Sequence, residues 1–333
     1  MRPANRALLA LALGGFGIGT GEFVTLGLLP NMAGDLHVSI PKAGELISAY
    51  ALGVVVGAPL LTAAAVRLPR KGLLISIVLV LAVENAASAV MPGFTSLLVL
   101  RFLTGLPHGA YFGVASVLAG NLVPAQRRSS AMAVVFAGLT VSNVIGVPLM
   151  TLVGQHSSWR VCFLLVGAME LLAAGCVAAV VPVDRRDPAD EAPRLRHELR
   201  AFRQPQIWLS LGIAMVGGAG LFATFSYIAP MMTHVTGFSA AAITPLLVLF
   251  GLGMTAGNLV GARLADRALM PTIYAALAAE VIVSACFFFS VENEITAAAT
   301  IFLFPFCSLA ILPALQSRIV TLAGGAPNLA AAS

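Results

Sequence analysis

Charged and polar side chains stand inside segments that are otherwise apolar enough to lie in a membrane. The stretch FGIGTGEFVTLGLLP carries Glu22, RFLTGLPHGAYFG carries Arg101 and His108, and GLTVSNVIGVP carries Asn143. A carboxylate in hydrocarbon costs several kcal/mol unless it is protonated, paired or facing water. Glu22 is therefore the first candidate for a group that binds and releases a proton, and Arg101 for a cation that interacts with it.

The elements that carry these residues are expected to be membrane-spanning helices. The 333 residues are 59% hydrophobic and only 10% charged, with a mean hydropathy of +0.95, whereas soluble proteins carry about 25% charged residues. A hydrocarbon core about 30 Å thick needs roughly 20 helical residues. Prolines inside the segments predict kinks rather than breaks. We expect ten helices, near 7–30, 43–66, 72–91, 95–121, 130–154, 159–182, 207–230, 240–264, 271–290 and 296–316.

Loop charge predicts the orientation. With the N-terminus in the cytoplasm, nearly all of the 19 Lys and Arg residues fall in cytoplasmic loops, and only Lys42 and Arg160 lie outside. This is the positive-inside pattern. The net charge of +5 thus belongs to membrane loops and does not indicate nucleic-acid binding.

A shift of 200 residues superimposes two halves of the chain. ALGVVVGAPL at 51–60 matches GLGMTAGNLV at 251–260, which predicts a parallel duplication of a six-helix unit. We expect an N-terminal bundle at 1–182, a cytoplasmic linker at 183–206 and a C-terminal bundle at 207–333. The repeat places two further helices beyond Ser333, so we expect the sequence to be a truncated one, with ten helices plus the start of an eleventh.

These features resemble the major facilitator superfamily. GEFVTLGLLP is similar to the first helix of its twelve-helix drug:proton antiporters, with the arabinose-efflux-like and chloramphenicol-resistance permeases as the nearest branch. RFLTGLPHGAYFG resembles the family's fourth-helix RxxxG motif through Arg101 and Gly105. GLTVSNVIGVP resembles the fifth-helix antiporter motif, although Val147 separates its last Gly and Pro. The resemblance implies an all-α polytopic protein with two pseudo-symmetric six-helix bundles.

The resemblance also implies roles for the buried charges. Helices one and four line the central cavity in the resembled fold. At about 1.5 Å per residue, Glu22 lies roughly 12 Å and Arg101 roughly 9 Å from the outer helix ends. The two could meet, with Arg101 favouring the ionised form of Glu22 and substrate or local drying favouring its protonated form. The alternatives are a permanent structural ion pair, or a Glu22 that reaches for the outer interface.

Other residues carry weaker expectations. His108 and Asn143 either line the cavity or serve packing, and Glu84, Glu170 and Glu280 are expected at interfaces or in structural pairs. The loop between helices two and three contains no Asp, whereas the corresponding loop in the second half contains Asp266. The remaining candidates are cavity aromatics (Tyr50, Phe112, Phe222, Phe225, Tyr227), the antiporter-type Gly/Pro motif (Gly138, Gly146, Pro148) and cytoplasmic gating loops (Arg67, Arg70, Lys71, Asp266, Arg267).

The sequence contains no motif that indicates an enzyme or an ATP-driven pump. RHELR at 196–200 lacks the second His of a zinc HExxH, and no GxSxG, CxxC or phosphate-binding GK[ST] occurs. We therefore expect the protein to bind no cofactor and no metal and to have no enzymatic activity. We expect a secondary active transporter in a bacterial inner membrane that exports small amphipathic compounds, chloramphenicol-like drugs or sugars, in exchange for protons. The alternatives are a proton-coupled importer and a non-transporting membrane fragment or sensor. The expected partners are a small molecule, protons and the bilayer; a monomer is favoured, with the oligomeric state left open.

Overall fold

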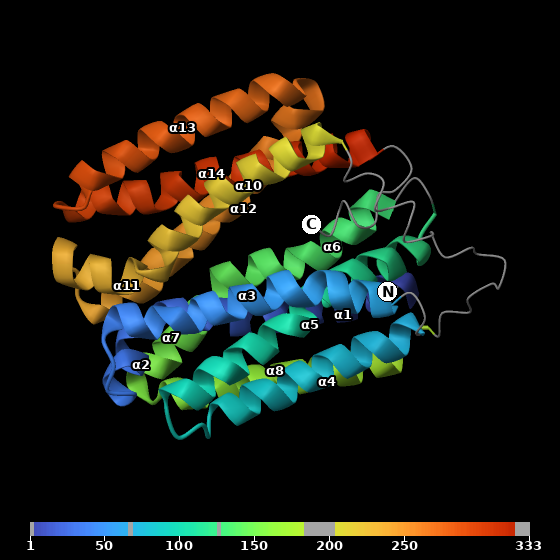
Figure 1. The fold of residues 1–333 in the computed structure, drawn as a ribbon, viewed down its shortest axis with the longest axis horizontal. Helices are drawn as coiled ribbons and strands as arrows, with labels where there is room; N and C mark the ends of the chain where they lie inside the picture. The colour runs from blue at the N-terminus through green and yellow to red at the C-terminus, as the bar shows by residue number, and fades with distance from the viewer. Residues whose placement is uncertain (1–2, 66–68, 125–127, 183–203, 324–333) are drawn as a thin grey trace. The chain divides into compact units, whose positions relative to one another are not determined.

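The structure is a computed structural model that describes residues 3–65, 69–124, 128–182 and 204–323. Every regular element in these ranges is helical (Figure 1). The first unit contains α1 (Pro3–Gly27), α2 (Leu29–Asp35), α3 (Ile40–Ala65), α4 (Arg70–Ser88), α5 (Phe94–Asn121), α6 (Arg128–Val141), the π-helix η2 (Ser142–Gly146), α7 (Val147–His156) and α8 (Trp159–Val180). The second contains α10 (Pro205–Ser226), α11 (Ile228–Met231), the π-helix η3 (Met232–Thr236), the short 3₁₀ helix η4 (Ala240–Ala242), α12 (Ile243–Arg267), α13 (Leu269–Ser290) and α14 (Glu294–Ala323).

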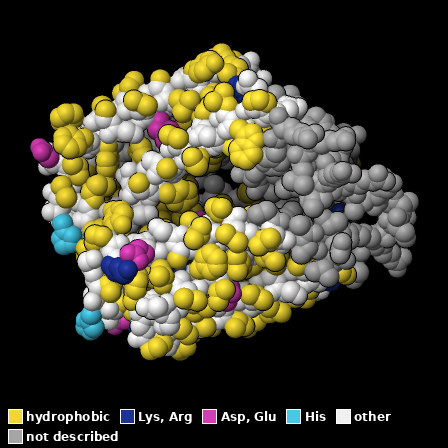
Figure 2. Space-filling model, viewed as in Figure 1, with side chains coloured by type: hydrophobic (Ala, Val, Ile, Leu, Met, Phe, Trp, Pro, Cys, Tyr) yellow, Lys and Arg dark blue, Asp and Glu magenta, His cyan; other side chains and the backbone are white. Residues whose placement is uncertain are grey.

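Ten helices within the described ranges are long and apolar enough to cross a membrane. They coincide with the ten expected from the sequence, so the all-helical polytopic prediction is confirmed. The helix ends shift by a few residues, because hydropathy marks the hydrocarbon-crossing part of a helix rather than its last turn. In Figure 2, hydrophobic side chains are spread over the described part of this face and few Lys, Arg, Asp or Glu side chains appear among them, as expected for a surface in contact with lipid.

The chain forms two compact units, Met1–Ala192 and Pro193–Ala331. Most of the predicted linker at 183–206 lies outside the described residues, so its cytoplasmic position stays a prediction. The division into two six-helix bundles, the second one incomplete, likewise stays a prediction.

Close helix packing in both units follows the 200-residue repeat. In the first unit, a β-carbon at Gly57 would collide with the backbone of Leu106, so α3 and α5 touch there backbone to backbone. In the second unit, Gly257 meets the backbone of Phe306 in the same way, between α12 and α14. Small residues allow such approaches in membrane helices. The duplicated glycines thus preserve the same contact in each unit.

Proline ends the first helix of each unit. The ring of Pro30 removes a backbone donor and clashes with the preceding turn, and the chain leaves helical geometry at Leu28, between α1 and α2. Pro230 has the same position in the repeat, and there the break falls at Tyr227, between α10 and α11. Pro107 and Pro305, which are expected to kink later helices, do not end them, since each lies inside a continuous helix, α5 or α14.

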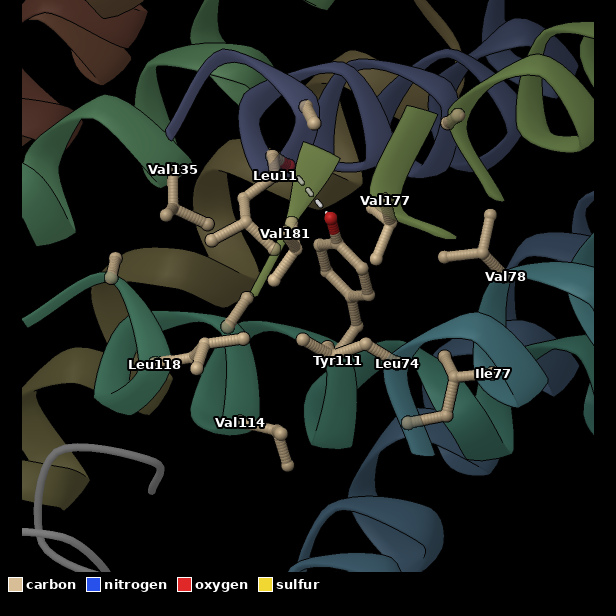
Figure 3. Close-up of a cluster of buried hydrophobic side chains, with 14 of the residues drawn as sticks. Leu11, Leu74, Ile77, Val78, Tyr111, Val114, Leu118, Val135, Val177 and Val181 are labelled. Carbon is tan, nitrogen blue, oxygen red and sulfur yellow. Dashed lines mark hydrogen bonds between the residues drawn. The ribbon is translucent and has the colours of Figure 1, made fainter. Parts of the chain in front are cut away.

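One cluster of buried apolar side chains in the first unit contains the phenol of Tyr111 (Figure 3). Tyr111 of α5 points toward α1 and donates a hydrogen bond to the backbone oxygen of Leu11 over 2.7 Å. A β-carbon at Gly14 would overlap the Tyr111 hydroxyl, so the glycine makes room for the ring. The contact holds α5 against α1, the two helices that carry Arg101 and Glu22. The side chains around the ring include Leu74, Ile77, Val78, Val177 and Val181.

Candidate functional site

Glu22 lies in the penultimate turn of α1, and its carboxylate faces α5. Glu22 Oε2 is 3.8 Å from His108 Nδ1, and the two side chains are 18% and 12% exposed. The carboxyl is therefore mostly enclosed but keeps an opening to the surface of its unit. A group in this position can exchange a proton without being fully surrounded by water.

Tyr50 of α3 completes a polar contact with His108. Tyr50 Oη lies 2.9 Å from His108 Nδ1, so the phenol donates its hydrogen bond when that nitrogen carries no proton. When Nδ1 is protonated, it donates instead, and the Glu22 carboxylate becomes the nearby anion. The imidazole nitrogen thus stands between a phenol and a carboxyl group.

Arg101 lies behind this contact and is 1% exposed. Its guanidinium donates to the backbone oxygens of Gly21 (3.3 Å) and Glu22 (3.5 Å). The guanidinium carbon also lies 4.4 Å from the centre of the Tyr50 ring and 5.7 Å from that of Phe163. Such cation–π contacts stabilise a charge that is removed from water. Arg101 is thus tied to α1 through the backbone and to α3 and α8 through aromatic rings.

The sequence expectation for Glu22 and Arg101 needs one correction. The two residues meet, but within the described ranges no carboxylate–guanidinium ion pair joins them. The guanidinium instead contacts the backbone oxygens of Gly21 and Glu22. The choice between a proton-carrying Glu22 and a permanent structural ion pair stays a prediction.

The five predicted cavity aromatics lie in different surroundings. Tyr50 and Phe112 belong to the first unit, where the Phe112 ring lies 5.3 Å from His108 and stacks on Phe136. In the second unit, Phe225 is buried and stacks on Phe250, whereas Phe222 and Tyr227 are largely exposed. The structure thus brings Tyr50 and Phe112 to Glu22 and His108, and the cavity role of the other three stays a prediction.

The antiporter-type motif forms an irregular segment of the fifth membrane helix. Asn143 lies in the π-helix η2, where its Nδ2 donates to the backbone oxygen of Leu139 over 3.0 Å and its Oδ1 has no partner among the described residues. π-Helical turns often occur at functional sites. Gly138 packs on the backbone of α1, Gly146 packs on Thr20, and Pro148 is the second residue of α7. Asn143 makes no described contact with Glu22 or His108, so its cavity role stays a prediction.

The predicted gating residues lie at helix ends. Arg70 and Lys71 begin α4, and Asp266 and Arg267 are exposed at the end of α12. Arg67 lies outside the described residues. Their role in gating stays a prediction.

The three acidic residues assigned to peripheral helices are buried or half-buried. Glu170 accepts a hydrogen bond from Asn85 over 2.9 Å, and Glu280 accepts one from Ser308 over 2.7 Å. Glu84 is half-buried on α4. The sequence reading missed Asn85, although a second polar residue directly after Glu84 in an apolar segment was the available signal.

Comparison with known proteins places this arrangement in a family. The family profile of the Major Facilitator Superfamily matches residues 11–332. The chain belongs to the Major Facilitator Superfamily. Across 98% of its length it is 37% identical to the inner membrane transport protein YdhP of Escherichia coli K12, covering 83% of that protein. Over the same shares of both chains it is 34% identical to a chloramphenicol resistance protein of Streptomyces lividans. A solved D-xylose–proton symporter has the same fold, with a TM-score of 0.77, 17% identity and coverage of 98% of this chain and 86% of that one.

Family membership confirms the fold and the general activity expected from the sequence. The chain is a multi-pass membrane protein with the fold of a secondary transporter, and its relatives are transporters rather than enzymes. In this superfamily member, the Glu22, Tyr50, Arg101 and His108 side chains form one connected polar cluster in the first unit. We call these four residues the Glu22 cluster.

Proposed function

We propose that the protein exports small amphipathic compounds in exchange for protons, with Glu22 as the proton-carrying residue. The observation that carries this proposal is the mostly buried Glu22 side chain, which is 18% exposed and whose Oε2 lies 3.8 Å from His108 Nδ1. A carboxyl group at low dielectric that keeps an opening changes its charge when a substrate displaces water from it. Binding of a proton and binding of a substrate then compete, and competition at one site is what an antiporter needs.

Arg101 and His108 assist Glu22 in different ways. The guanidinium keeps its charge throughout, so it favours the ionised form of Glu22 after the proton leaves. Tyr50 Oη and His108 Nδ1 share a hydrogen bond of 2.9 Å, and the same nitrogen lies 3.8 Å from Glu22 Oε2, close enough for an electrostatic contact but not for a hydrogen bond. Proton release from Glu22 is thus supported by a fixed cation and by a neighbouring group that accepts and donates protons.

The proposed location is a bacterial inner membrane with a cytoplasmic N-terminus. The concentration of Arg and Lys in the loops on one side supports this orientation. The name of the Escherichia coli relative, an inner membrane transport protein, supports the same compartment.

The test uses chloramphenicol as the probe, because one relative is a chloramphenicol resistance protein. In proteoliposomes with an imposed pH gradient, the wild-type chain is expected to exchange chloramphenicol for protons. Glu22→Gln keeps the side-chain shape but cannot release a proton, so gradient-driven exchange should be lost. Undiminished exchange by this variant would refute the role assigned to Glu22.

Glu45→Gln is the matched control, since Glu45 is a half-exposed glutamate paired with Lys42 at a helix start in the same unit. It should transport as the wild type does. The direction is tested in cells: expression of an exporter raises resistance to chloramphenicol, whereas an importer raises sensitivity.

We also propose that the charged helix ends gate the movement between states. Asp266 and Arg267, exposed at the end of α12, can form changing contacts at the membrane surface. Asp266→Asn should slow chloramphenicol exchange without removing its dependence on the pH gradient. An unchanged exchange rate contradicts the gating role.

A further inference from the structure

A second buried carboxyl group packs against α1, at a residue different from the contacts already described. Glu170 of α8 is 1% exposed, and Gly17 of α1 leaves the space that its side chain occupies. A β-carbon at Gly17 would lie 3.0 Å from Glu170 Cγ. Glu170 is therefore held inside the unit, against the same helix that carries Glu22.

Asn85 is the hydrogen-bond partner of Glu170, and it is also 1% exposed. Its Nδ2 donates one hydrogen to Glu170 Oε2 over 2.9 Å and the other to the backbone oxygen of Leu81 over 3.1 Å. Both amide hydrogens are thus used. The two remaining oxygens, Asn85 Oδ1 and Glu170 Oε1, are buried and have no hydrogen-bond partner within the described ranges.

This pair lacks one hydrogen when Glu170 is ionised. Both unpartnered oxygens are then acceptors, and an unpartnered buried acceptor is unfavourable. A proton on Glu170 Oε1 turns that oxygen into a donor, and Asn85 Oδ1, on the amide that already donates to Glu170 Oε2, is an unpartnered acceptor. Protonation forms one O–H bond at Oε1 with a proton taken from water, and deprotonation returns it.

Arg101 links this pair to the Glu22 cluster. The guanidinium donates to the Gly21 oxygen, and a β-carbon at Gly21 would lie 3.4 Å from Asn85 Nδ2 on the other side. The charged or titratable groups that act on Glu170 are Arg101 on α5, Glu84 on α4 and Tyr50 on α3. On α1, Gly17 faces Glu170 and Gly21 faces Asn85. Arg101 is the only cation among these groups.

We propose that Glu170 is a second proton-binding residue of the first unit, positioned by Asn85 and balanced in charge against Glu22 through Arg101. One buried guanidinium needs one carboxylate for a neutral interior. When Glu22 is ionised, Glu170 holds its proton. When Glu22 binds a proton, Glu170 becomes the anion that balances Arg101, so the two acids carry protons in alternation. This assignment rests on the proposed proton exchange at Glu22.

The first test needs no substrate. Infrared spectra of the purified chain in lipid are recorded over a pH titration, and the stretching band of protonated carboxyl groups is followed. The Gln variant Glu170→Gln keeps the hydrogen bonds to Asn85, and it should lose one component of the band. Glu84→Gln, which changes the neighbouring half-buried acid on α4, should keep that component. A Glu170→Gln spectrum identical to the wild type, or a component that never disappears as the pH rises, overturns the proposal.

The charge balance is tested by following the Glu170 component of the infrared band in a Glu22 variant. In Glu22→Gln, Arg101 has only Glu170 to balance it, so the ionised form of Glu170 is favoured. The Glu170 component should then disappear at a lower pH than in the wild type. An unshifted titration overturns the link between the two acids.

Asn85→Ala tests the positioning role of Asn85. It also provides a second measurement on Glu170 if the Glu170→Gln variant does not fold. Asn85→Ala keeps Glu170 but removes its hydrogen-bond partner, so the frequency of the Glu170 component should shift. An unshifted frequency overturns the positioning role. If wild-type proteoliposomes fail to exchange chloramphenicol for protons, the proposed function fails, whereas the infrared titration still decides whether Glu170 binds a proton.

Discussion

The backbone contact between α3 and α5 makes the stability of the first unit sensitive to a single methyl group. A β-carbon at Gly57 would overlap the oxygen, Cα and carbonyl carbon of Leu106. All three are backbone atoms, so a side-chain rotation cannot relieve the overlap. Gly57→Ala must therefore push the two helices apart along their shared face.

The size of this effect follows from two opposing contributions. Overpacking a well-packed interior costs about 1–3 kcal/mol, and a collision with backbone belongs at the upper end. Ala is about 1 kcal/mol more favourable than Gly inside a helix. We therefore expect Gly57→Ala to lower the free energy of unfolding by about 2 kcal/mol.

Gly175 of α8 provides the matched control, because a β-carbon there would meet nothing within 4 Å. Gly175→Ala gains the helix preference without the collision, so it should be about 1 kcal/mol more stable than the wild type. Gly257→Ala tests the repeat, since Gly257 meets the backbone of Phe306 in the second unit. It should be destabilised as Gly57→Ala is.

The assay is thermal unfolding of the detergent-purified chain, followed by tryptophan fluorescence at a single scan rate. The order of transition temperatures should be Gly175→Ala, then wild type, then the two variants at the repeated glycines. The reasoning is refuted if Gly57→Ala unfolds at the same temperature as Gly175→Ala, because the collision would then cost nothing.

Three further substitutions test single contacts. Arg101→Lys keeps the charge but loses the planar guanidinium that stacks on aromatic rings and donates to two carbonyls. The free energy of unfolding should therefore fall by about 2 kcal/mol in the thermal assay, and an unchanged transition temperature contradicts this. Tyr111→Phe removes one buried hydrogen bond and should cost about 1 kcal/mol in the same assay while chloramphenicol exchange stays normal. Asp35→Asn weakens the contacts of Asp35 with Trp159 (3.0 Å) and Arg160 (3.0 Å). Since the ion pair with Arg160 is partly exposed, the free energy of unfolding should fall by less than about 1 kcal/mol, and the difference from the wild type should shrink in high salt.

The membrane helices could be predicted from the sequence because a single physical quantity decides them. Each needs enough apolar residues to cross the hydrocarbon, and this requirement is readable residue by residue. The packing of α3 on α5 was also visible in outline, because Gly57 and Gly257 recur at the same place in the repeat. Backbone contact between helices leaves this trace in the sequence, since only a small residue permits it.

The partners of the buried polar groups could not be predicted in the same way. Glu22 and Arg101 stood out because charge is costly in hydrocarbon, but the cost does not say which neighbour satisfies each group. His108 meets Tyr50, which lies 58 positions earlier in the chain, and this pairing depends on the rotation of α5 against α3. A rotation of a few tens of degrees changes the partner without changing hydropathy.

The glycines of α1 explain why the Glu22 side chain keeps part of its surface exposed. Gly17 faces Glu170 on α8, Gly19 faces Ser142 in η2, and Gly21 faces Val166 on α8 beside the amide of Asn85. Neighbouring helices therefore approach α1 closely on the sides where these residues lack a side chain. Glu22 follows Gly21 directly, a rotation of about 100° around the helix, and its side chain retains 18% exposure. A helix packed this closely leaves few directions open, so moving the acid by one residue would bury it against another helix.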